Sequence, residues 1–80
     1  MTKQEAERLV PIMLSVDGNC SVCVRGVFCR VITAFPEHNW VALALQSPDF
    51  KNLHETEEDF RESISFGLEE RETEERMAEK

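Results

Sequence analysis

The hydrophobic positions near the N-terminus repeat with the period of an α-helix. They recur at i, i+3, i+4 and i+7, and they are Ala6, Leu9, Val10 and Met13. Thr2 and Glu5 have the residue types and the spacing of a helix capping box. Pro11 interrupts the pattern, because proline removes a backbone hydrogen bond inside a helix. We therefore expect an N-terminal helix that either stops near Leu9 or bends and continues to about Leu14.

The segment of residues 20–35, CSVCVRGVFCRVITAF, has the composition of a β-strand. Val, Ile and Phe are enriched in strands, and the preceding residues 17–19 have the composition of a turn. Gly26 is the natural position for a bulge or a tight reversal. After Gly26 both alternating faces are largely apolar, which indicates a central strand or one covered by helices. We therefore expect this segment to belong to an antiparallel sheet.

Residues 36–39 carry a strong turn signal, since proline suits an early turn position and asparagine tolerates unusual backbone angles. The next six residues, WVALAL, are then expected to pair back as the partner strand of a hairpin. Ser47, Pro48 and Asp49 have the residue types that begin a helix. The predicted hairpin gives the antiparallel sheet two or three strands, and a helical segment follows it.

The last third of the chain predicts one long helix. Thr56 and Asp59 resemble a second capping box, and the apolar stripe at i, i+4 and i+8 consists of Phe60, Ile64 and Leu68. Phe66 lies off that stripe. The stripe ends at Leu68, so residues 69–80 are expected to be a solvated helix end that frays.

Taken together, these patterns predict a single α+β domain over residues 1–80. It consists of an N-terminal helix, a two- or three-stranded antiparallel sheet and a long acidic C-terminal helix. A chain of 80 residues buries a small core.

The net charge of −7 lies entirely in the last third of the chain. Residues 1–54 hold five acids and five bases, whereas residues 55–80 hold eleven acids and four bases. Direct binding to nucleic acid or to an anionic membrane is not expected, because both require a basic footprint. An acidic segment of this kind attracts basic protein surfaces.

The composition predicts a cytoplasmic protein. No apolar run approaches the roughly 20 residues that a bilayer crossing needs, and the acidic N-terminus does not have the pattern of a signal peptide. Three cysteines, an odd number, fit reduced thiols rather than a disulfide framework.

Four potential metal ligands, Cys20, Cys23, Cys29 and His38, raise the question of a zinc site. In a strand, residues three apart point to opposite faces, so Cys20 and Cys23 would not chelate one ion together. A redox pair would require the first thiol at a helix N-terminus, which a β-rich segment does not provide. We therefore expect core thiols, with no metal and no cofactor.

A catalytic site is not expected either. His54 begins a segment, HETEE, that resembles a zinc-protease helix, but its fifth residue is Glu58 where a histidine is required. No glycine-rich phosphate loop is present, and nothing ties a nucleophile to a base. The chain is therefore predicted to be non-enzymatic.

The remaining candidate surface is a partner-binding one. Its predicted residues are Glu57, Glu58, Asp59, Glu62, Glu69, Glu70, Glu72, Glu74, Glu75 and Trp40. The acids would contact a basic surface of a partner protein. Trp40 is interpreted either as a core anchor or as an interface hot spot.

In size, acidity and lack of catalytic residues the chain resembles small phage-encoded inhibitors of host defence, including anti-CRISPR and anti-restriction proteins. The resemblance implies an inhibitor that blocks a nucleic-acid-binding complex in the host cytoplasm. Two alternatives remain. One is a homo-oligomerising adaptor or regulatory module, such as a homodimer, suggested by the apolar faces of residues 20–35. The other is a small zinc-stabilised domain that uses the cysteines.

Overall fold

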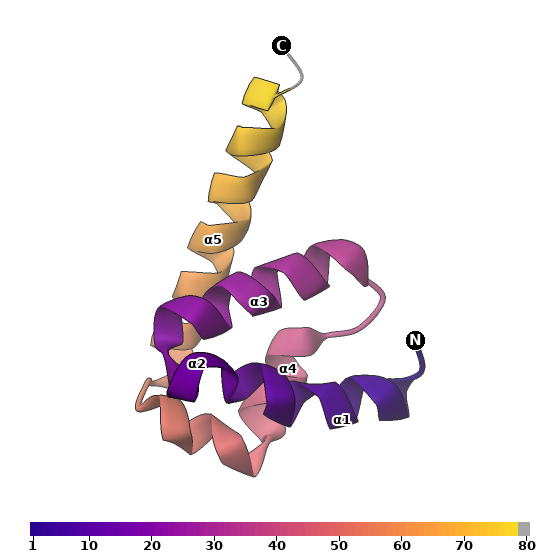
Figure 1. The fold of residues 1–80 in the computed structure, drawn as a ribbon, viewed down its shortest axis with the longest axis vertical. Helices are drawn as coiled ribbons and strands as arrows, with labels where there is room; N and C mark the ends of the chain where they lie inside the picture. The colour runs from indigo at the N-terminus through magenta and orange to yellow at the C-terminus, as the bar shows by residue number, and fades with distance from the viewer. Residues whose placement is uncertain (79–80) are drawn as a thin grey trace.

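The computed structural model describes the backbone of residues 1–78 and the side chains of residues 1–70. Within that range the chain forms helices and turns and contains no strand. The elements are α1 (Lys3–Leu14), α2 (Val16–Asn19), α3 (Ser21–Ala34), α4 (Trp40–Gln46), the 3-10 helix η1 (Pro48–Leu53) and α5 (Glu57–Ala78). Figure 1 shows α3 crossing the lower part of α5, while the upper part of α5 extends away from the other helices.

The predicted α+β fold with an antiparallel sheet is wrong, because residues 20–35 form α3 rather than a strand. Val24 and Phe28, four residues apart, are both fully buried on one side of this helix, and Val31 packs against the core one turn later. The apolar residues along one side of a helix are three or four positions apart. Read as a strand, the same residues fall on both faces, so the pattern fitted either structure. Burial in the tertiary structure therefore outweighs the modest β-propensity of valine and isoleucine.

The predicted hairpin partner is also wrong, because Trp40–Gln46 forms α4. The turn at residues 36–39 is present, but it connects two helices. Asn39 caps α4, and its Oδ1 accepts a hydrogen bond from the backbone N–H of Ala42 at 3.1 Å. Alanine and leucine, which make up most of this segment, are among the best helix formers.

The predicted helix starts are confirmed. The backbone N–H of Thr2 donates to Glu5 Oε1 at 2.9 Å, and the N–H of Glu5 donates to Thr2 Oγ1 at 3.2 Å. Ser47 and Thr56 likewise accept hydrogen bonds at the starts of η1 and α5. The helix α1 continues through Pro11 to Leu14, which is the longer of the two predicted outcomes.

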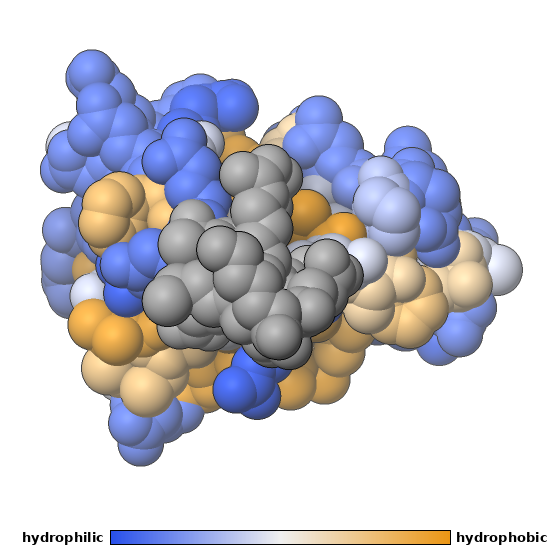
Figure 2. Space-filling view, turned by 90° about the horizontal axis from the view of Figure 1, so that it is seen from above, coloured by the Kyte–Doolittle hydropathy of each residue, from blue (hydrophilic) through white to orange (hydrophobic). Residues whose placement is uncertain are grey.

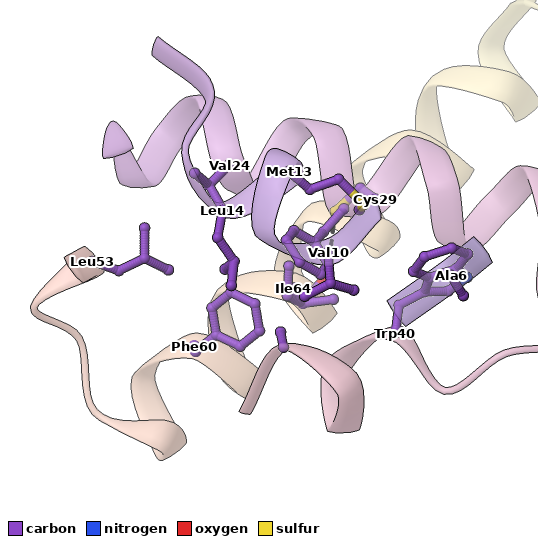
Figure 3. Close-up of a cluster of buried hydrophobic side chains, with 12 residues drawn as sticks. Ala6, Val10, Met13, Leu14, Val24, Cys29, Trp40, Leu53, Phe60 and Ile64 are labelled. Atoms are coloured by element: carbon purple, nitrogen blue, oxygen red, sulfur yellow. Dashed lines mark hydrogen bonds between the residues drawn. The ribbon is translucent and has the colours of Figure 1, made fainter. Parts of the chain in front are cut away.

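The core lies where α1, α3, α4, η1 and the first half of α5 meet (Figure 3). Its largest fully buried side chains are Trp40, Phe28, Phe60, Leu14, Val10 and Val24. The ring of Phe60 packs edge-on against Phe28 and Phe50, with ring centroids 5.5 and 5.2 Å apart. Phe60 and Ile64 thereby anchor α5, as the predicted stripe required. No helix in the described part of the chain has the length and apolar composition that a membrane crossing requires.

A glycine sets the distance between α3 and α5. A Cβ atom added to Gly67 would lie 2.7 Å from Cys29 Sγ, so the Cys29 side chain packs directly against the backbone of α5 at this position. The buried thiol of Cys29 donates a hydrogen bond to the carbonyl of Ile64 at 3.7 Å (Figure 3). Glycine is unfavourable inside a helix, but at position 67 its lack of a side chain permits this close crossing of α3 and α5.

Candidate functional site

The predicted acids of α5 lie on the surface as far as the side chains are described. The exposed ones are Glu57, Glu58, Asp59, Glu62, Glu69 and Glu70. Glu72, Glu74 and Glu75 lie outside the residues whose side chains the structure describes. Leu68 is the last described residue of α5 that packs against the core, and the helix backbone continues to Ala78.

The acids are not spread evenly around α5. Residues at i, i+4, i+8, i+11 and i+12 share a broad helix face, and here they are Glu58, Glu62, Phe66, Glu69 and Glu70. We call these five residues the acidic face. Glu58, Glu62, Phe66 and Glu69 lie on the side of α5 away from Phe60 and Ile64. Glu70 lies at the edge of this face and lines a shallow hollow together with Arg25 and Arg30 of α3.

Phe66 is the apolar centre of the acidic face, and the predicted binding set did not include it. Its side chain is 56 % exposed, although phenylalanine is more often found inside a protein. The signal was present in the sequence, because Phe66 lies off the apolar stripe of α5. Seen from the end at which α5 projects, hydrophobic side chains reach the surface in several places among hydrophilic ones (Figure 2).

The acids at the start of α5 also stabilise the helix itself. Glu57, Glu58 and Asp59 occupy its first turn, where negative charge interacts favourably with the helix dipole. Arg61 Nη2 lies 3.1 Å from Glu57 Oε1, an exposed i, i+4 ion pair. The acids further along, such as Glu62 and Glu70, are not part of this helix start.

Trp40 lies in the core and not on the predicted surface. It is 1 % exposed, and its indole N–H donates to the Phe35 carbonyl at 2.8 Å. The imidazole of His38 packs edge-on against it, with ring centroids 5.6 Å apart. The position agrees with the core-anchor interpretation, so Trp40 is not part of the acidic face.

A second cluster forms where α2 leads into α3. Asp17, Gly18 and Asn19 have φ values of 49°, 65° and 68°, so the backbone makes a left-handed turn. The side-chain amide of Asn19 donates to the Leu14 carbonyl at 3.0 Å and so ties the turn to the end of α1. Cys20 then occupies the N-cap of α3.

This turn brings two thiols and a carboxylate together. The Cys23 thiol donates to Asp17 Oδ2 at 3.3 Å, and the ligand atoms of Asp17, Cys20 and Cys23 all lie within 4.8 Å of one another. We call these three residues the thiol cluster. Both cysteines are half-buried, and Asp17 is exposed.

The two thiols have different acidities. The backbone N–H of Cys23, then its thiol, then the N–H of Val22 stabilise a Cys20 thiolate and lower its pKa below 9.0. The neutral Cys20 thiol makes no capping hydrogen bond, so this stabilisation acts on the ionised sulfur. The hydrogen bond to Asp17, followed by the one to Cys20, raises the pKa of Cys23 to about 11. Cys20 is therefore the more easily ionised thiol.

The sequence-based argument against a Cys20–Cys23 pair depended on the predicted strand. In a helix, residues three apart share a face. Cys20 is also at the N-terminus of α3, a position that lowers the pKa of a thiol and makes it more reactive. The thiol cluster contains neither Cys29, which is buried, nor His38, whose Nε2 lies 2.9 Å from the Met1 carbonyl oxygen. The four predicted ligands are therefore not brought together, and three donors are one short of a structural zinc site.

The largest hollow that we describe has a volume of about 330 Å³. It is lined by Lys3, Glu37, His38, Asn39, Ala42, Leu43 and Gln46. This lining holds an imidazole and a carboxylate but no serine, threonine or cysteine that the imidazole could activate. No protein-family model, no curated protein and no solved structure matches this chain.

Proposed function

We propose that the protein is a non-enzymatic binding protein whose α5 docks on a basic surface of a partner protein. The observation that carries the proposal is the placement of the charge: the entire net charge of −7 follows residue 54, and α5 projects from the rest of the molecule (Figure 1). A helix of 22 residues is about 33 Å long. It can therefore present acids at a distance from the neutral body.

The acidic face suggests what the partner surface contains. Phe66 is surrounded along the helix by Glu62, Glu69 and Glu70. Arginine side chains suit such a surface, because a guanidinium can pair with carboxylates and stack on an aromatic ring. A partner with arginines around a shallow apolar depression would complement this face.

Basic surfaces of this kind commonly hold DNA or RNA. We infer that the protein occupies such a surface and thereby inhibits a nucleic-acid-handling complex, in the manner of anti-CRISPR and anti-restriction proteins. The proposed location is the cytoplasm, or the host cytoplasm if a phage encodes the chain, since both the proposed partner and reduced thiols are found there. Neither nucleic acid nor a membrane is a proposed direct ligand.

The homo-oligomerising alternative has less support. It was suggested by apolar residues on both faces of residues 20–35, but Val24, Phe28 and Cys29 are used in the core of the same chain. Light scattering at high protein concentration separates the two ideas, because a monomer is incompatible with an oligomerising module.

Charge reversal tests the proposal. The variant E62K/E70K changes two acids of the acidic face, and E7K/E37K changes two exposed acids of the body by the same total charge. Partners captured from a host extract by the native chain should be lost with E62K/E70K and kept with E7K/E37K. Each exposed charge pair contributes about 0.2–1 kcal/mol, so replacing two attractions by two repulsions should cost about 0.8–4 kcal/mol and weaken binding by about fourfold or more.

Four further measurements make the test specific. Binding of the captured partner should weaken as salt rises from low to high ionic strength, and nucleic acid should compete with the protein. F66A should weaken binding without changing the salt dependence. Binding that is indifferent to salt, or a chain ending at Leu68 that binds as well as the full chain, would refute the proposal.

A further inference from the structure

We propose that Cys20 and Cys23 form a thiol–disulfide exchange site that reacts with low-molecular-weight disulfides of the glutathione type. The product is an intramolecular disulfide between the two residues. This inference concerns α2 and α3 and does not depend on the binding role of α5. It rests on the convergence of two thiols and a carboxylate within 4.8 Å at a helix start.

The position of Cys20 makes it the attacking thiol. It is the N-cap residue of a 14-residue helix, where the first N–H groups of the helix face a thiolate. The two residues that follow, Ser21 and Val22, are exposed, and Val22 is 63 % exposed. A small disulfide can therefore reach the sulfur from the solvent side.

Cys23 is placed to complete the reaction. It lies one helical turn after Cys20 on the same face, and its thiol already donates to Asp17 Oδ2 at 3.3 Å. The carboxylate can take the thiol proton when Cys23 attacks. The turn of residues 17–19 holds Asp17 there, because Asn19 is hydrogen-bonded to the end of α1.

The reaction balances in two steps. The Cys20 thiolate attacks one sulfur of the small disulfide, forms a mixed disulfide and releases one thiolate, which takes the proton that Cys20 lost. Cys23 then gives its proton to Asp17, attacks Cys20 Sγ and releases the second thiolate, which takes that proton from Asp17. The protein dithiol is oxidised to a disulfide, and the small disulfide is reduced to two thiols.

The same three residues are less suited to a metal ion. A structural zinc ion takes four protein ligands, and the thiol cluster provides three donors. Disulfide exchange needs only the two thiols and a proton acceptor, and all three are present. The experiment below distinguishes the two uses.

The native chain is incubated with mixtures of reduced and oxidised glutathione, and its intact mass is measured after the reaction is stopped by acid. We expect the mass to fall by that of two hydrogens, with no glutathione retained, and peptide mapping to place the disulfide between Cys20 and Cys23. C23A should instead retain one glutathione on Cys20.

C29A is the matched control, because it removes the third, buried cysteine and should react as the native chain does. Circular dichroism establishes that each variant is folded. An unchanged mass of the native chain, or glutathione retained equally on Cys20 and Cys23, would overturn the proposal. Stoichiometric zinc in protein purified without added metal would also overturn it, because zinc-bound thiolates are not available for exchange.

Discussion

Replacing Gly67 by alanine should destabilise the protein, although the same change stabilises an ordinary helix. The added methyl group would lie 2.7 Å from Cys29 Sγ, well inside van der Waals contact. Cys29 cannot easily move aside, since it is 2 % exposed and donates to the Ile64 carbonyl. The substitution therefore sets helix propensity against overpacking at the crossing of α3 and α5.

The two effects can be separated by a double-mutant cycle. Glycine to alanine in a helix interior contributes about 1 kcal/mol of stability, whereas overpacking a well-packed site costs about 1–3 kcal/mol. The net effect of G67A in the native chain is then a loss of about 0–2 kcal/mol. In a C29A background the clash is absent, so G67A should stabilise by about 1 kcal/mol. The coupling between the two sites is therefore about 1–3 kcal/mol.

Urea unfolding followed by circular dichroism and Trp40 fluorescence measures all four corners of the cycle. The slopes of the transitions should agree, so that the shifts of the midpoint report stability. If G67A stabilises the native chain and the C29A chain by the same 1 kcal/mol or so, the proposed contact between α3 and α5 does not exist in solution.

Three further predictions concern single groups. W40F should cost about 1–3 kcal/mol in urea unfolding, because the half-buried Phe35 carbonyl that accepts from the indole N–H loses its partner; an unchanged midpoint would contradict this. Iodoacetamide should alkylate Cys20 below pH 9.0, whereas Cys23, whose pKa is about 11, should stay largely unreacted until higher pH; equal pH profiles would contradict the assignment. The N–H and then the hydroxyl of Thr2 hold the pKa of Glu5 below 4.5, so its contribution to stability is present above pH 4.5 and is lost as pH falls through the lowered pKa. Unfolding midpoints of E5Q and the native chain should therefore differ above that pH and converge in acid, and a constant difference would argue against the capping box.

The helix starts could be predicted from the sequence because they depend on local hydrogen bonds. Thr2, Ser47 and Thr56 each accept from a backbone N–H two or three residues later. The assignment of residues 20–35 failed because it depended on β-propensity, which is weak and follows the tertiary environment. The length of the segment was the better guide, since its sixteen residues exceed an ordinary strand but suit a helix.

The exposure of the acids on α5 could be predicted from the sequence, but the thiol cluster could not. Charged residues such as Glu62 and Glu70 are exposed in almost any fold, so their position followed from composition. The thiol cluster could not be predicted, because Cys20 and Cys23 lie on opposite faces of a strand but on the same face of a helix. The approach of Asp17 depends in addition on three successive residues with positive φ. The sequence predicted a turn at residues 17–19, but not that this turn would bring Asp17 to the cysteines.

The last packed residue of α5 has a consequence for how such a molecule can change over time. Because Leu68 is the final described position that touches the core, turns inserted after it would lengthen the projecting helix by about 5.4 Å each and leave the interior untouched. The length of α5 beyond the core and the packing of the core are therefore independent of each other. The helix beyond Leu68 can therefore change in length by whole turns without a compensating substitution in the core.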